Sequence, residues 1–165
     1  TSFQELATNI SHRRVATLVK KTGNSLLAKI NGIIAADEAR HASAYSDFVK
    51  RIFELDPSQM MVSFEDMMRR KIIMPAHFMR QSGDKVGELW SHFSDAAQRT
   101  KVYTAQDYID ILSSLIRDWN IDKITDLNDL GEKARDYLMA LPGRLQRITD
   151  RMKEPEKEYE FKWIG

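Results

Sequence analysis

Residues 26–53 read LLAKINGIIAADEARHASAYSDFVKRIF. Apolar side chains recur in this stretch at three- and four-residue steps, and they belong to Leu27, Ile30, Ile34, Tyr45, Phe48 and Ile52. This spacing is typical of a helix that turns one face toward a hydrophobic core. We therefore expect a helix from Leu26 to Phe53 that packs against other helices of the same protein.

Two polar residues, Glu38 and His41, continue this apolar stripe. A buried charge without a partner costs several kcal/mol, so such residues persist in a core only when they are paired or bind a metal. The i, i+3 spacing places the carboxylate and the imidazole on one face of the helix, and di-iron carboxylate bundles use the same Glu-x-x-His motif. An isolated Glu-x-x-His is also common as a solvated pair, and this alternative stays open.

A third ligand candidate comes from the preceding segment. The pattern from Phe3 to Lys21 predicts a helix, and Thr22-Gly23-Asn24 is a turn that would end it. If the two helices fold back on each other, Glu5 lies level with residue 40, on a helix face shared with Thr8, His12, Val15 and Val19. The hairpin thus predicts two carboxylates beside one imidazole, a ligand set that suits iron or manganese.

The composition excludes several classes of protein. The chain has 165 residues, of which 42% are hydrophobic and 30% charged, so we expect one folded domain rather than disorder or a membrane span. The net charge of +1 gives no indication of nucleic-acid binding. The absence of cysteine fits a reducing compartment and argues against zinc-finger and iron–sulfur sites. Because residue 1 is threonine, we expect a piece of a longer protein.

The rest of the chain also reads as helical, so we expect an all-α bundle over residues 1–165. One expected helix begins at Pro57 and runs through Ile72, up to a break at Met74-Pro75, and another runs from Trp90 to Lys101 with Leu89, Phe93 and Ala97 inward. The next runs from Ala105 to Trp119 behind a Thr104/Asp107 capping box, with an inner stripe of Tyr108, Ile109, Leu112 and Ile116, and the last from Leu130 to Met152. Pro142-Gly143 should kink the last helix or divide it into two. We expect a turn at residues 81–84 and a C-terminal tail whose apolar residues pack back on the body, namely Tyr159, Phe161, Trp163 and Ile164.

Short sequence motifs that resemble those of one known enzyme family occur throughout the chain. They include TSFQELAT at 1–8, IAADEARH at 34–41, FELDP at 53–57, DMMR at 66–69, MPAH at 74–77 and VYTAQDY at 102–108. The chain resembles the soluble acyl-acyl carrier protein desaturases of plants and bacteria, specifically their C-terminal half. The resemblance implies a ferritin-like di-iron enzyme, usually dimeric. Such an enzyme uses dioxygen and electrons from ferredoxin to insert a cis double bond into an acyl chain on acyl carrier protein.

The resemblance also implies roles for individual residues. Glu5 would be the single carboxylate ligand of one helix, and Glu38 and His41 would be the Glu-x-x-His ligands of the next. The remaining assignments are Thr8 beside the iron pair, where it could assist oxygen activation, Asp37 and Arg40 around the ligands, and Met74 near the substrate channel. The second half of the ligand set would come from upstream, so we expect this chain alone to be inactive and to expose an apolar face.

The carrier protein is acidic, so docking should use basic surface. Arg144, Arg147 and Arg151 recur at three- to four-residue steps and are candidates, with Arg69, Arg70 and Lys71 as a second set. An ordinary solvated helix face explains the same pattern. One departure from the family is Ala42, because an acidic residue often follows the histidine.

Two other functions stay open. One is a different ferritin-like di-iron protein, such as an iron store, a peroxide scavenger or a radical subunit, for which Tyr45 would be the tyrosine to check. The other is a non-catalytic helical module in which Glu5, Glu38 and His41 only pair with each other. We interpret His12, His77 and His92 as structural. The expected location is the cytoplasm of a bacterium or the plastid stroma of a plant.

Overall fold

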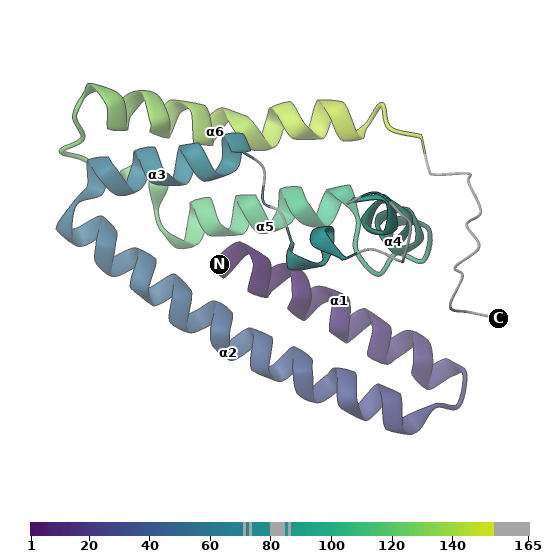
Figure 1. Ribbon diagram of the computed structural model, residues 1–165. Coiled ribbons are helices and arrows are strands. Elements are labelled where there is room, and N and C mark those ends of the chain that lie inside the picture. The colour runs from purple at the N-terminus through teal and green to yellow at the C-terminus, as the bar shows by residue number, and fades with distance from the viewer. Residues whose placement is uncertain (71, 73, 80–84, 86, 154–165) are drawn as a thin grey trace.

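A computed structural model of the chain is built from helices (Figure 1) and describes residues 1–70, 72, 74–79, 85 and 87–153. The helices are α1 (Ser2–Lys21), α2 (Ser25–Leu55), α3 (Pro57–Arg70), α4 (Glu88–Arg99), α5 (Ala105–Asp118) and α6 (Asp129–Thr149), with short 3₁₀ helices η1 (Pro75–Phe78) and η2 (Ile121–Lys123). No strand occurs in the described residues, so the all-α prediction is confirmed. None of the described helices combines the length and apolar character needed to cross a membrane.

Helices α1 and α2 form the predicted antiparallel hairpin and lie side by side along the length of α1 (Figure 1). The chain reverses at Gly23, whose φ of +83° lies in the left-handed region that glycine adopts without strain. Asn24 then begins α2, because its side-chain oxygen accepts a hydrogen bond from the Leu27 backbone N–H at 3.0 Å. The turn expected at residues 22–24 is therefore present.

The main hydrophobic core lies among α3, α5, α6 and the adjoining ends of α1 and α2. Its fully buried side chains are Met61, Leu112, Leu115, Ile121 and Leu138. The Trp119 ring packs against Phe53 and Phe64, with ring centroids 6.3 and 5.1 Å away, and its indole N–H donates to Ser46 Oγ at 2.9 Å. The predicted inner stripe of α5 is confirmed for Ile109, Leu112 and Ile116, which are buried, while Tyr108 is half-buried.

The prediction that the apolar stripe of α2 faces the core is wrong for most of its residues. Phe48 is 62% exposed, Ile52 45% and Ile30 44%, and of the six stripe residues only Ile34 is half-buried. The reason lies in the packing: within the described part of the chain, α2 packs mainly against α1 and α3. The residues of α2 that become buried there are Asn31, Ala35, Ala42 and Phe53, which lie beside the apolar stripe rather than on it. Phe93 of α4, also expected to point inward, is 39% exposed.

Several helix boundaries differ from the predictions. Helix α3 ends at Arg70, two residues before Ile72. Helix α6 is a single helix that contains Pro142 and ends at Thr149, so the division into two helices is wrong. The turn expected at residues 81–84 and the tail residues Tyr159, Phe161, Trp163 and Ile164 lie outside the described residues.

An ion pair joins α1 to the start of α5. The two terminal nitrogens of Arg14 donate to the two carboxylate oxygens of Asp107, at 2.6 and 2.7 Å. The same carboxylate accepts from the Thr104 backbone N–H at 2.8 Å, while Thr104 Oγ1 accepts from the Asp107 N–H at 3.3 Å, which completes the predicted capping box. Burial alone would raise the pKa of Asp107, but the hydrogen bonds from Arg14 and Thr104 outweigh it and lower that pKa.

We expect Asp107→Asn to lower the free energy of unfolding by about 1–3 kcal/mol at pH 7, because charge-assisted hydrogen bonds are lost. The lowered folded-state pKa means that this stabilisation is complete above the ordinary aspartate pKa of about 4 and is lost as pH falls through the folded-state value. The difference in free energy of unfolding between wild type and Asp107→Asn, measured by urea unfolding, should therefore shrink below about pH 4. Asp118→Asn, an exposed change on the same helix, is the control, and a gap that widens in acid contradicts the prediction.

Candidate metal centre

Two helices bring Glu5, Glu38 and His41 together at one level of the hairpin. The His41 Nδ1 atom lies 3.3 Å from Glu5 Oε2 and 3.5 Å from Glu38 Oε2. One ligand atom from each residue lies within 4.8 Å of the other two. Glu5 comes from α1 and the other two from α2, as the hairpin register predicts. In the described part of the chain, no other group of three acidic, histidine or cysteine residues has this geometry.

Hydrogen bonds between the helices fix their register on both sides of the cluster. Asn9 Nδ2 donates to the Ala35 carbonyl at 2.6 Å, and on the other side Ser2 Oγ lies 3.4 Å from the Ala42 carbonyl. Both alanines are buried, so α1 and α2 approach closely at the positions next to the ligands. Ala42, which stands where the desaturases often have an acidic residue, thus places a small side chain against α1.

His12 lies one level further down the hairpin and makes a different contact. Its Nδ1 atom forms a hydrogen bond of 2.8 Å with Asn31 Oδ1, and the Asn31 amide donates to the Leu27 carbonyl at 2.9 Å. This pairing supports the interpretation of His12 as a structural residue that holds the hairpin together.

The two carboxylates of the cluster are more protected from solvent than the imidazole. Glu5 and Glu38 side chains are 18% and 19% exposed, against 59% for His41. Hydrogen bonding to Glu38, together with burial, raises the pKa of Glu5, whereas hydrogen bonds from Glu5, Thr8 and His41 lower the pKa of Glu38. Adjacent carboxylates of this kind hold one proton between them or a cation in its place. Two carboxylates and one imidazole fit iron or manganese.

The structure places the other predicted residues around this cluster. The Thr8 hydroxyl donates to the backbone carbonyls of Gln4 and Glu5, both at 3.0 Å, and it also contacts Glu38. Asp37 and Arg40 form an ion pair with each other on the exposed side of α2, where Arg40 is 71% exposed. Their contacts are thus with each other more than with the ligands.

The more distant candidates lie away from the hairpin. Met74 is half-buried just before η1, and its carbonyl accepts from the His77 N–H at 2.9 Å. Arg144 and Arg147 are exposed on α6, and Arg151 is exposed in the turn that follows the end of the helix at Thr149. In the second basic set, Arg69 and Arg70 pair within α3, and Lys71 lies outside the described residues.

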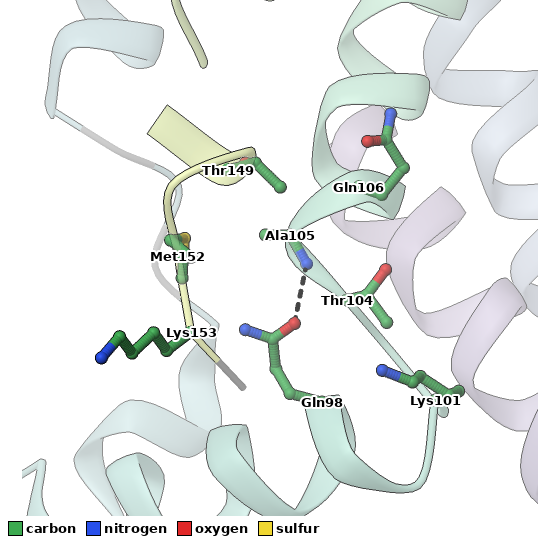
Figure 2. Close-up of a pocket in the computed structure, with 8 residues that line it drawn as sticks. All are labelled: Gln98, Lys101, Thr104, Ala105, Gln106, Thr149, Met152 and Lys153. Carbon is green, nitrogen blue, oxygen red and sulfur yellow. Dashed lines mark hydrogen bonds between the residues drawn. The ribbon is translucent and has the colours of Figure 1, made fainter. Parts of the chain in front are cut away.

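Sequence reasoning missed two hollows, because each is formed by segments far apart in the chain. A mostly apolar hollow of about 320 Å³ lies between the start of α1, the second half of α2 and α3, and its walls include Gln4, Tyr45, Phe48, Met60 and Trp119. The Tyr45 ring lies edge-on to Phe48, with centroids 6.2 Å apart. A second hollow of about 310 Å³ lies where the ends of α4 and α6 meet the start of α5 (Figure 2), and there Gln98 Oε1 accepts from the Ala105 N–H at 3.1 Å.

Comparison with known proteins gives the family. The profile described as fatty acid desaturase matches residues 1–165. The chain belongs to this family. Members of the fatty acid desaturase family have a ferritin-like helical fold, so the hairpin and the helices packed on it form part of such a bundle, and the resemblance drawn from the motifs is confirmed.

Curated desaturases align with almost the whole chain. Stearoyl-[acyl-carrier-protein] 9-desaturase 1 of Arabidopsis thaliana is 49% identical over 99% of this chain and 42% of its own length. The corresponding spinach (Spinacia oleracea) protein is 47% identical over 99% of this chain and 41% of its own length. Palmitoyl-[acyl-carrier-protein] 4-desaturase 3 of Ophrys sphegodes is 44% identical over 99% of this chain and 42% of its own length. The chain therefore spans about two fifths of the length of these desaturases.

Proposed function

We propose that this chain is the C-terminal part of an acyl-[acyl-carrier-protein] desaturase, which inserts a cis double bond into an acyl chain on acyl carrier protein. The convergence of Glu5, Glu38 and His41 carries this proposal, within a family whose members named above act on acyl-carrier-protein substrates. Dioxygen as oxidant, a ferredoxin-type electron donor and a homodimer belong to the same proposal. Since the relatives are chloroplastic, the plastid stroma is the compartment that we favour.

The three clustered residues would hold iron. When bound, an iron pair supplies an oxidant, generated from dioxygen, that is strong enough to take hydrogen from an unactivated CH₂ group. The chain's own contribution is to hold Glu5 and Glu38 as paired, partly desolvated carboxylates that favour a hard cation. The Thr8 hydroxyl lies beside Glu38 in the same place. The mostly apolar hollow whose wall includes Gln4, the neighbour of Glu5 in the chain, offers apolar surface on the same hairpin.

The exposed face of α2 fits a bundle with further helices. Leu26 is 68% exposed, Ile33 55% and Phe48 62%, and together they present apolar surface of the kind that marks a protein interface. In our proposal, helices of the longer protein cover this face and supply the remaining iron ligands. Met74 then adjoins the substrate channel, and Arg144, Arg147 and Arg151 take part in docking the acidic carrier protein.

A chimera tests the proposal. We expect that the chain, exchanged for the aligned segment of the Arabidopsis relative, gives a protein that desaturates stearoyl-acyl carrier protein, because 49% identity extends over 99% of the chain. The chain alone should give no product, since three ligands cannot complete a di-iron site. Gas chromatography of the acyl products measures both. An inactive chimera that folds and binds iron, or a chain active by itself, contradicts the proposal.

A further inference from the structure

Arg14 lies on the face of α1 that is opposite to the ligands. Phe3, Ala7, Ile10 and Arg14 follow one another at steps of four, three and four residues and so share one side of the helix. Phe3 and Ala7 are buried, and Ile10 packs against the main core. Glu5 points the other way, toward α2. Helix α1 is therefore held between α5 on one side and the ligands of α2 on the other.

The contacts between α1 and α5 differ in how strictly they fix the helix. The Phe3 ring lies against Tyr108 with centroids 4.5 Å apart, a contact that is mainly apolar and tolerates small rotations. The Arg14 guanidinium makes two parallel bonds to Asp107, and this fork fixes both direction and distance. Asp107 is itself immobilised, because its side chain is 9% exposed and bound to the backbone and the hydroxyl of Thr104.

The Arg14 guanidinium also forms a hydrogen bond with the turn before α5. Its Nη1 atom donates to the Lys101 carbonyl at 3.1 Å, in addition to Asp107. Arg14 is thus held to two separate backbone segments, the Lys101 turn and the first turn of α5. A lysine at position 14 would keep the charge but would lose the two-point contact.

Rotation of α1 about its own axis moves Glu5 relative to the other ligands. Side-chain ends lie about 5–6 Å from a helix axis, so a rotation of about 20° displaces the Glu5 carboxylate by about 2 Å. Metal ligands must sit within about 0.2 Å of their required distances. Of the three clustered residues, only Glu5 comes from α1. We propose that Arg14 is a positioning residue for the metal centre, which fixes the rotation of α1 through Asp107 and thereby aims Glu5. This rests on the proposed function, because it requires the cluster to bind a metal.

Cobalt(II) titration of the folded chain tests the positioning role, since Co²⁺ reports both affinity and geometry through its visible absorption. We expect Arg14→Gln to bind Co²⁺ at least tenfold more weakly than wild type, with a changed absorption spectrum. The Co²⁺ affinity of Arg14→Lys should lie between those of wild type and Arg14→Gln. Arg70→Gln removes an exposed arginine that pairs within α3 and is the charge-matched control, and Ile111→Val in buried α5 is a control for lost stability.

The outcomes separate the positioning role from the metal site itself. Weak binding and an altered spectrum in both Arg14 variants, with wild-type behaviour in the two controls, support the inference. If Arg14→Gln does not fold, Arg14→Lys carries the comparison. Arg14 variants with unchanged spectra, or with losses no larger than that of Ile111→Val, overturn it. Wild-type protein that binds no Co²⁺, or binds equally after Glu38→Gln, overturns the proposed function and the positioning role together.

Discussion

Glu38→Gln should reduce the affinity of the chain for Fe²⁺ at least a hundredfold under anaerobic conditions at neutral pH. Glu38 is central to the cluster, because it contacts Glu5, Thr8 and His41. The amide has nearly the same shape as the carboxylate but carries no charge and one fewer oxygen. Loss of even an outer partner of a metal ligand typically costs 10–100-fold in affinity, so loss of a ligand should cost more. Isothermal titration calorimetry with Fe²⁺ measures the change.

A matched glutamate on the same helix serves as the control. Glu54 lies near the end of α2, is 63% exposed and pairs with Arg51 at 2.5 Å. Glu54→Gln makes the same chemical change on the same helix, and we expect it to bind Fe²⁺ as wild type does. Equal Fe²⁺ affinities for Glu38→Gln and wild type would mean that the three residues only pair with one another, as in a non-catalytic helical module.

The sequence predicted this cluster because all the information needed is local. The turn at Gly23 fixes where the chain reverses, and helical rise then sets Glu5 opposite His41 without reference to the rest of the fold. The capping box at Thr104 is local in the same sense. Arg14 and Asp107 are 93 residues apart, and nothing in the spacing of either residue identifies the other as its partner. Such a pair becomes visible only when the helices are packed.

The apolar stripe of α2 shows a different limit. Periodicity correctly gave an amphipathic helix, but it carries no information about what covers the apolar face. Phe48 and Ile52 are exposed because α1 and α3 pack on a neighbouring face of α2, where Ala42 and Phe53 are buried. Pro142 is a third case. Proline removes one backbone donor and usually breaks a helix, yet α6 continues through it. Leu138 and Leu141 lie in the helical turn just before Pro142. Both are buried, and they hold this part of α6 in the core.

Leu138→Ala should be among the most destabilising single substitutions in the described part of the chain. Leu138 is fully buried in the main core, on the face of α6 that packs against α3 and α5. Truncation of a buried leucine to alanine leaves a cavity and costs about 2–5 kcal/mol. A domain of this size has a total stability of about 5–15 kcal/mol, so the loss would be a large part of it. Urea unfolding followed by circular dichroism gives the difference.

Leu130→Ala is the matched control because it makes the same substitution in the first turn of the same helix. Leu130 is 64% exposed, so its truncation leaves no cavity, and alanine is at least as good a helix former as leucine. We expect its free energy of unfolding to stay within about 0.5 kcal/mol of wild type. The contrast separates burial from helix propensity, since both substitutions change propensity equally. A loss below about 1 kcal/mol for Leu138→Ala would mean that α6 is not an integral part of the core, and that the helices around Met61 and Leu112 are held together without it.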